Sequence, residues 1–383
     1  MFADSESFPR ELLEQTFERR TGFFKDHKVA HSHLMRAYEL LKEIIRQPAG
    51  ITIVKVIGLT GAGKTTLRMM IETHLIQETL HDLAVDSSRL PFVSLQVPGY
   101  ERGFDWSDLY RRLLRVMDEP LIDRRVKLVR HPGAESRPAF PVAETKSMAA
   151  LRESFESALR HRRPVVVMMD DAQRFARVTG SRKLSDQQDV IQSLADEANV
   201  LFILLGTYQL TQFIGLSGQL ARRATTVHLP RYRITEPAEA NAFLSVLDNF
   251  QRHLPMERQP DLLAQRDLLY RRSLGCVGIL KDWLTKALSL AGQSRSQSIT
   301  LEQLKATAPD VASCHTILTE ATEGELLLDL NSDERALERR LWTPSSKNAV
   351  KKENAGENTK RSRRQPFDRN PGRDRVGLDL NVS

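Results

Sequence analysis

The residues best suited to chemistry form one glycine-rich turn, Gly58-Leu59-Thr60-Gly61-Ala62-Gly63-Lys64-Thr65-Thr66. The turn fits the phosphate-binding pattern GxxxxGK[ST], which requires a strand before it and a helix after it. Glycines let successive backbone N–H groups turn inward, and these donors bind anions together with the helix N-terminus. In this pattern Lys64 reaches the β- and γ-phosphates, and the Thr65 hydroxyl is a ligand of Mg²⁺. The turn therefore predicts a site for ATP and Mg²⁺, with a structural glycine-rich turn as the alternative. The residues expected to bind the nucleotide are Gly58, Thr60, Gly61, Ala62, Gly63, Lys64, Thr65 and Thr66.

A pair of acidic residues, Asp170 and Asp171, follows a second apolar run. Four apolar residues that end in an acid describe a Walker B motif, in which Asp170 would hold Mg²⁺ and Asp171 would orient or deprotonate the attacking water. The alternative is a strand end followed by two ordinary acidic loop residues. Thr207 ends the next apolar run and would hydrogen-bond the γ-phosphate or the water, unless it is an ordinary turn threonine.

Two further basic positions are candidates for contact with the phosphates. Arg222 and Arg223 precede another strand candidate, and a guanidinium there would project into a neighbouring subunit's nucleotide as an arginine finger. The alternative is a solvated basic pair at a helix end. Lys281, three residues after Gly278 on a predicted helix, would contact the phosphates from above, and its alternative is a surface lysine.

The elements that must position these residues alternate between strands and helices. Near-continuous apolar strands separated by helices predict an α/β fold, with a five-stranded parallel sheet covered by helices on both faces. Ligands of such sheets bind at the carboxyl ends of the strands, where the polar residues described above all lie. The five strand candidates are Ile51–Ile57, Phe92–Val97, Val165–Met169, Leu201–Leu205 and Thr226–Leu229.

Helices dominate outside this region. Ser32–Arg46 places its apolar residues on one face, and the strand signal vanishes after Pro230. Thr300 and Gln303 resemble a capping box that opens a late helix. We therefore expect an N-terminal helical extension over 1–50, an α/β nucleotide-binding domain over 51–232, a small helical lid over 233–310, a helical connecting segment over 311–344 and a basic tail over 345–383.

Composition sets limits on the protein's class. The 383 residues suffice for one full-sized core, and the only cysteines, Cys276 and Cys314, fit a reducing compartment rather than a disulfide framework. The charged N-terminus does not resemble a signal peptide, and no apolar run reaches the roughly 20 residues that span a bilayer. We therefore expect a cytoplasmic protein with no membrane partner. The net charge is +7, and ten Lys/Arg against five Asp/Glu after residue 344 predict a disordered basic tail.

These motifs, in this order and with a helical lid behind the sheet, resemble the AAA+ ATPases. The stretch between residues 165 and 232 looks more narrowly like the TnsC/TniB transposition ATPases. By position, Arg223 falls on the final arginine of their Gln-Leu-Ala-x-Arg motif. This chain has Asp171 where most relatives have Glu, and Ala224 where the family often has Phe. The segments that carry the resemblance are Asp170-Asp171-Ala172-Gln173, Gly180-Ser181-Arg182-Lys183, Leu204-Leu205-Gly206-Thr207, Gly218-Gln219-Leu220-Ala221-Arg222-Arg223 and Leu229-Pro230-Arg231.

The resemblance implies a mechanism. ATP-bound subunits assemble head-to-tail on double-stranded DNA into a ring or filament, because a heterologous interface need not close. The assembly recruits a transposase, a target-selection protein starts or caps it, and slow ATP hydrolysis, stimulated by DNA and oligomerisation, disassembles it. The DNA contacts would be mainly to phosphates and therefore salt-dependent. The residues expected to make them are Arg102, Arg182 and Lys183.

Three other functions compete with this interpretation. A metabolic P-loop kinase would need an acceptor pocket and would act as a monomer. A nucleotide-gated adaptor would bind ATP but barely hydrolyse it, with Asp171 as a degraded site. Another AAA+ DNA protein, such as a replication initiator or helicase loader, would share the fold and the nucleotide but not the transposase.

Overall fold

The computed structural model of the chain describes residues 7–101, 103–120, 122, 127–128, 141–142, 148–176, 184–213, 222–331 and 334–342. Its centre is a five-stranded sheet with the order β2-β5-β6-β1-β7, and every neighbouring pair of strands is parallel. This arrangement is the AAA+ P-loop NTPase fold that the sequence predicts. The strands are β1 (Ile53–Ile57), β2 (Phe92–Gln96), β5 (Val166–Asp170), β6 (Leu201–Gly206) and β7 (Ala224–His228).

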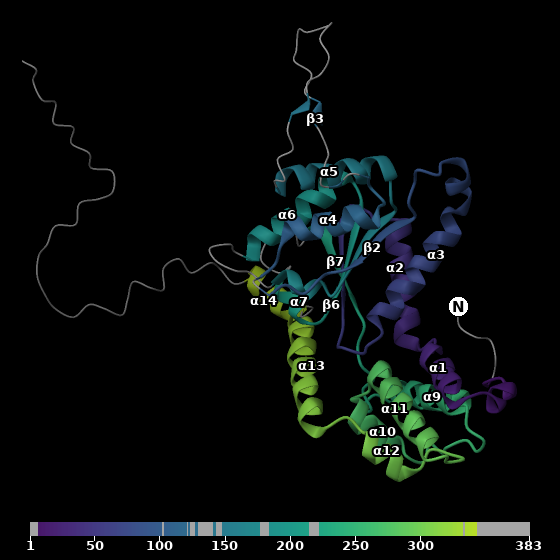
Figure 1. The fold of residues 1–383 in the computed structure, drawn as a ribbon. Coiled ribbons are helices and arrows are strands. Elements are labelled where there is room, and N and C mark those ends of the chain that lie inside the picture. Colours follow the sequence, from purple (N-terminus) through teal and green to yellow (C-terminus); the bar gives the residue numbers. More distant parts are fainter. Residues whose placement is uncertain are drawn as a thin grey trace, which may run out of the picture. The chain divides into compact units, whose positions relative to one another are not determined.

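The strands are buried because helices cover both faces of the sheet. Every residue of β5 and β6 is buried, as expected for central parallel strands. Helices α4, α5 and α6 gather on one side, and α2 and α3 lie on the other (Figure 1). Their bounds are α2 (Ser32–Arg46), α3 (Lys64–Val85), α4 (Trp106–Val116), α5 (Met148–Arg162) and α6 (Leu184–Ala198).

A helical lid with its own core follows β7. Trp283, Phe250 and Leu284 are fully buried there. Thr300 caps the last helix of the lid as its sequence predicts: its Oγ1 accepts from the Gln303 backbone N–H at 3.2 Å, and the Gln303 side chain accepts from the Thr300 N–H at 3.0 Å. The lid helices are α9 (Pro237–His253), α10 (Arg266–Ser273), α11 (Val277–Gln293) and α12 (Leu301–Thr307).

The N-terminal 50 residues divide between the two cores. Phe24 of α1 (Phe17–Asp26) is buried in the lid core, and α1 packs against α11. Leu34 and Leu41 of α2 are buried in the core of the sheet domain. The segment between them, which includes His31, therefore joins the lid to the sheet. A short 3₁₀ helix, Arg10–Glu14, precedes α1.

The chain then returns from the lid to the sheet domain. Helix α13 (Val311–Asn331) begins beside α10 and packs against α7 (Gln209–Phe213) after β6 (Figure 1). Residues Met1–Asn331 form one compact unit. A second unit, Ser332–Ser383, contains α14 (Glu334–Trp342), and the predicted basic tail lies outside the described residues.

Two short features were not expected from the sequence. β3 (Lys127–Leu128) and β4 (Pro141–Val142) form a two-stranded antiparallel pair, and a 3₁₀ helix (Ala172–Ala176) follows the acidic pair. None of the helices described is long and apolar enough to cross a membrane.

Candidate nucleotide-binding site

The glycine-rich turn connects β1 to α3 and has the backbone of an anion cradle. Gly61 and Gly63 have φ angles of 79° and 100°, a left-handed region that other residues rarely adopt. Gly63 is the N-cap of α3, so the amides of Lys64, Thr65 and Thr66 belong to a first helical turn that offers no internal acceptors. These donors lie at the carboxyl end of β1, where the fold class binds its ligands.

Lys64 is buried and its ammonium is held inside the turn. Nζ donates to the main-chain oxygens of Gly58 at 2.8 Å and Leu59 at 2.7 Å. Burial lowers the pKa of Lys64, and the carboxylates of Asp170 and Asp171 oppose this effect. Both acceptors are uncharged main-chain oxygens, so they do not neutralise the positive charge of the ammonium.

The predicted Mg²⁺ ligands lie in hydrogen-bond contact. The Thr65 hydroxyl donates to Asp170 Oδ2 at 2.9 Å, although the two residues are 105 positions apart. Asp170 Oδ1 accepts from the backbone N–H of Asp171 at 2.9 Å. Arg68, one helical turn after Thr65, places Nε 3.5 Å from Asp170 Oδ2. A hydroxyl and a carboxylate are the hard oxygen donors that Mg²⁺ prefers, so the pair fits the predicted ion.

Asp171 adopts a left-handed backbone with φ of 56°, which is unusual for a residue other than glycine. Its carboxylate receives three donors. Gln96 Nε2 lies 2.9 Å from Oδ2, Gln173 Nε2 lies 3.2 Å from Oδ1, and Arg174 Nη2 lies 2.9 Å from Oδ2. A water molecule would therefore have to share this carboxylate with them or displace one of them.

Thr207 lies beside this cluster, because the last hydrogen bond of β6 aligns the two strand ends. The Gly58 N–H donates to Gly206 O at 3.3 Å, which places the start of the turn next to Thr207. The Thr207 N–H donates to Gln173 Oε1 at 3.3 Å. Within the described part of the chain, the Thr207 hydroxyl is buried without a hydrogen-bond partner. An unsatisfied buried hydroxyl costs about 1–3 kcal/mol, so a phosphate or water would stabilise it.

Arg223 lies at the amino ends of the strands, away from the glycine-rich turn. It immediately precedes β7, and its carbonyl accepts from the Thr52 N–H at 2.9 Å at the amino end of β1. Thr52 and Gly58 are six positions apart along extended chain, or about 20 Å at 3.3 Å per position. In this arrangement the guanidinium is ion-paired with Asp196 of α6 at 2.5 Å. Arg223 therefore cannot reach the glycine-rich turn of its own subunit.

The lid closes on the turn through two glycines. The Gly278 N–H donates to Gly61 O at 2.8 Å, and a Cβ on Gly278 would lie 2.4 Å from that oxygen. Lys281, one turn further along α11, donates instead to the carbonyl of Lys25 on α1 at 2.7 Å. Burial lowers the pKa of Lys281. The structure thus brings the start of α11 to the phosphate cradle but joins Lys281 to the N-terminal helix.

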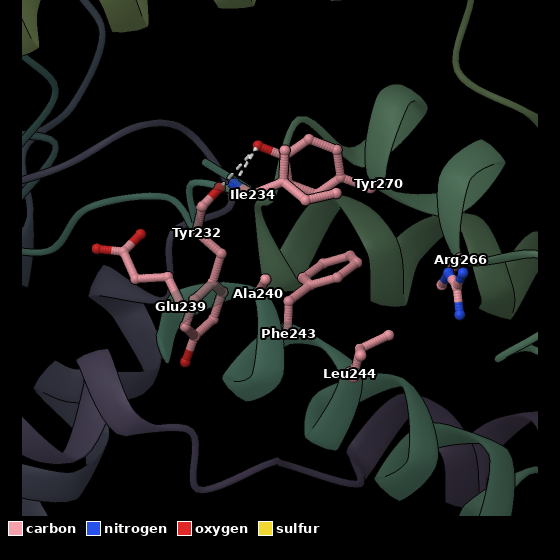
Figure 2. Close-up of a pocket in the computed structure, with 8 residues that line it drawn as sticks. All are labelled: Tyr232, Ile234, Glu239, Ala240, Phe243, Leu244, Arg266 and Tyr270. Carbon is pink, nitrogen blue, oxygen red and sulfur yellow. Dashed lines mark hydrogen bonds between the residues drawn. The ribbon is translucent and has the colours of Figure 1, made fainter. Parts of the chain in front are cut away.

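A separate cavity lies within the lid and is not the nucleotide site. It has a volume of about 190 Å³ and lies between α9, α10 and the segment after β7 (Figure 2). The Tyr270 hydroxyl donates to Tyr232 O and accepts from the Ile234 N–H, each at 3.1 Å. Ligand pockets usually measure about 300–1,000 Å³, so this cavity is too small for a nucleotide.

The three residues predicted to bind DNA, Arg102, Arg182 and Lys183, lie outside the described residues. The same holds for Gly180, Ser181 and Gly218–Ala221 of the transposition-ATPase pattern.

Several residues of the site were missed by sequence reasoning. A weak signal existed for Gln96, which ends its strand in register with Asp170, and for Arg68, which is one helical turn from Thr65. The missed residues, which contact Asp170 or Asp171, are Arg68, Gln96, Gln173 and Arg174.

Comparison with known proteins agrees with this geometry. Residues 47–214 match the family described as AAA domain, a span that begins just before β1 and ends just after α7. No curated protein matches the chain.

Solved structures resemble the chain only broadly. The Aeropyrum pernix ORC2 protein has 14% identity and a TM-score of 0.47, over 76% of this chain and 70% of that one. Drosophila ORC bound to DNA has 14% identity and a TM-score of 0.44, over 80% and 67%. A Walker-type ATPase of Pyrococcus abyssi has 14% identity and a TM-score of 0.43, over 80% and 75%. These scores carry no functional argument. The family match and the sheet order together show that the chain contains an AAA domain within an AAA+ P-loop NTPase fold.

Proposed function

We propose that the protein is an ATPase that assembles head-to-tail on double-stranded DNA and regulates transposition. ATP binds between the glycine-rich turn and the lid, with Mg²⁺ held by Thr65 and Asp170. The bound ion would neutralise charge on the β- and γ-phosphates. Lys64 exchanges its main-chain acceptors for phosphate oxygens, Thr207 supplies its free hydroxyl, and Asp171 orients the attacking water.

The position of Arg223 is the observation that carries this proposal. An arginine finger raises the rate of phosphoryl transfer about 10³–10⁵-fold. Arg223 lies at the amino ends of the strands, whereas the glycine-rich turn of the same subunit lies at their carboxyl ends. In a head-to-tail stack, the amino ends of one subunit's strands would face the carboxyl ends of its neighbour's strands. The site would then be complete only in an assembly, which is how ATP would hold subunits together on DNA.

The roles of DNA, transposase and target-selection protein come from the resemblance in residues 165–232. They are tested first by the rate of phosphate release per subunit, measured against protein concentration with and without duplex DNA. We expect the rate to rise with both, and Lys64→Ala to abolish it. A rate indifferent to both would refute assembly-dependent hydrolysis. Electron microscopy with duplex DNA and a non-hydrolysable ATP analogue would then show whether Arg223 of one subunit faces Lys64 of the next.

One observation favours a second candidate, a nucleotide-gated adaptor. The Asp171 carboxylate is occupied by Gln96, Gln173 and Arg174, so little of it is available to a water molecule. An adaptor would assemble with ATP yet release phosphate no faster than the Lys64→Ala variant. A replication initiator or helicase loader would hydrolyse ATP on DNA but would not stimulate a transposase, and a transposase gene beside this one would favour transposition.

A further inference from the structure

Helix α13 carries a buried glutamate into the surroundings of the nucleotide site. Glu325 is 6% exposed, and Arg231 pairs with it through both carboxylate oxygens, Nε to Oε1 at 3.0 Å and Nη2 to Oε2 at 3.3 Å. Arg233 adds a third contact at 3.5 Å. An arginine guanidinium forms the same bidentate geometry with a carboxylate or with a phosphate.

Arg231 belongs to the segment that joins β7 to the lid and passes beside the glycine-rich turn. Two residues before it, Leu229 contacts the turn so closely that a Cβ on Gly58 would lie 2.4 Å from the Leu229 carbonyl oxygen. The next residue, Tyr232, donates its N–H to Gly275 O at 3.0 Å, just before α11. Burial raises the pKa of the Cys276 thiol to about 12, and the positive charges of Arg231 and Lys64 both oppose this shift. Arg231 therefore lies between a residue that contacts the glycine-rich turn and a residue that contacts the start of α11.

A second glutamate of α13, Glu320, lines a groove together with Tyr208, the residue that follows Thr207. In the described part of the chain, the Oε1 atom of Glu320 is buried and accepts no hydrogen bond. Glu320 and Glu325 thus place two carboxylates of α13 beside Tyr208 and Arg231.

The attachment of α13 to the sheet domain is local. Gly324 touches the Tyr208 ring so closely that a Cβ would lie 2.0 Å from Cγ, and Ala321 is fully buried. Beside these contacts an open groove of about 660 Å³ separates α13 from α7, and Leu326 on the outer side is 58% exposed. Ile317, Ala321 and Leu328 pack against the core of the sheet domain, whereas the strands are paired with one another, so α13 can leave without unfolding the sheet.

We propose that Arg231 is a phosphate-binding residue of the ATP state, and that Glu325 occupies it until ATP displaces α13. The bound phosphate replaces the Glu325 carboxylate as the partner of Arg231, and the displaced helix exposes the face that it covers. This inference rests on the nucleotide site proposed above and adds a gate to it. It predicts that neutralising Glu325 raises the affinity for ATP, whereas removing Arg231 lowers it.

Binding of a fluorescent non-hydrolysable ATP analogue tests this prediction. Glu325→Gln keeps the side-chain shape but loses the charge, so the dissociation constant should fall about 10-fold, because charge-assisted hydrogen bonds contribute about twice as much as neutral ones. Gly324→Ala, which pushes α13 away from Tyr208, should change it in the same direction. Arg231→Ala should raise it about 10-fold or more, and Glu323→Gln, an exposed neighbour on the same helix, should leave it unchanged.

A merely structural ion pair would make Glu325→Gln and Arg231→Ala weaken binding alike, and that outcome would overturn the proposal. So would unchanged affinity in both variants. If the wild type binds the analogue no better than Lys64→Ala does, the nucleotide site itself fails, and the gate fails with it. Wild-type binding that depends on Lys64 but not on Glu325 refutes the gate alone.

Cys314 offers a readout that does not depend on affinity. It lies in the first turn of α13, is 8% exposed and places Sγ 3.5 Å from the Arg272 carbonyl of the lid. In a Cys276→Ser background it is the sole thiol. We expect a thiol reagent to modify Cys314 faster with the ATP analogue than with ADP or no nucleotide. Equal rates in all three conditions would show that α13 does not move.

Discussion

A mixture of two inactive variants tests the placement of Arg223 most directly. Lys64→Ala removes the phosphate-binding ammonium, and Arg223→Ala removes the proposed finger. Because the two residues lie at opposite edges of one sheet, about 20 Å apart along β1, they would serve different nucleotides in an assembly. Each variant alone should be inactive, whereas their mixture should recover interfaces that combine an intact Lys64 with an intact Arg223.

The expected recovery follows from counting interfaces. With equal amounts and random head-to-tail order, about a quarter of the interfaces pair an Arg223→Ala nucleotide site with a Lys64→Ala neighbour. The single Arg223→Ala variant should lose about 10³-fold in hydrolysis, so recovery to as much as a quarter of the wild-type rate is easily measured. Arg223 and Asp196 are 43% and 33% exposed, and such pairs contribute about 0–1 kcal/mol, so the variant should remain folded.

The assay is steady-state phosphate release on duplex DNA, with thermal denaturation as the check on folding. Arg222→Ala is the matched control, because Arg222 is the adjacent exposed arginine and carries no assigned role. The reasoning would be refuted if the mixture stayed as inactive as its components while both variants bound DNA. It would also be refuted if Arg223→Ala reduced single-turnover hydrolysis equally at dilutions where the protein is monomeric.

Three other perturbations have defined outcomes. Gly278→Ala places a Cβ 2.4 Å from Gly61 O, so it should push the lid off the cradle and weaken ATP binding roughly 10-fold or more in a filter-binding assay. Asp171→Asn should lower single-turnover hydrolysis by about 10²-fold, the usual range for a positioned base, and prolong the lifetime of DNA complexes; complexes as short-lived as wild type would exclude hydrolysis as the release step. Burial lowers the pKa of His228 from 6.5 to about 4, and its Nε2 lies 2.9 Å from the Tyr208 hydroxyl. The folded state therefore binds fewer protons than the unfolded state between these values, so stability should fall as pH drops from 6.5 towards 4, and His228→Gln should flatten that part of the denaturation profile.

The sheet and the phosphate cradle could be predicted because their signals are local. The glycines of the turn, the apolar strand runs and the Thr300 capping box each lie within a few residues, and β1 and α2 form where the pattern indicates. A strand buried on both faces needs an uninterrupted apolar run, which few other structures require. The order of the strands was not predicted, because it depends on pairing between segments far apart in sequence.

The partners of the site residues could not be predicted for the same reason. Asp171 is contacted by Gln96, which comes from another strand 75 positions earlier. Glu325 meets Arg231 across 94 positions and after an entire helical domain. The division of α1 and α2 between two cores is equally a matter of tertiary packing, because Phe24 is buried in the lid core and Leu34 in the core of the sheet domain.

The site's cations share one property that bears on how ATP acts. Lys64 is held by main-chain oxygens, Arg231 by Glu325 and Arg223 by Asp196. A buried charge left without a partner costs several kcal/mol, so the phosphate contacts of the buried Lys64 and the largely buried Arg231 must be exchanges and not additions. Arg223 is partly exposed and gives up only a weak surface pair. We therefore expect ATP to bind less tightly than its contacts alone would suggest. We also expect the internal partners to recapture the cations once the γ-phosphate leaves, which would favour product release and separation of the subunits.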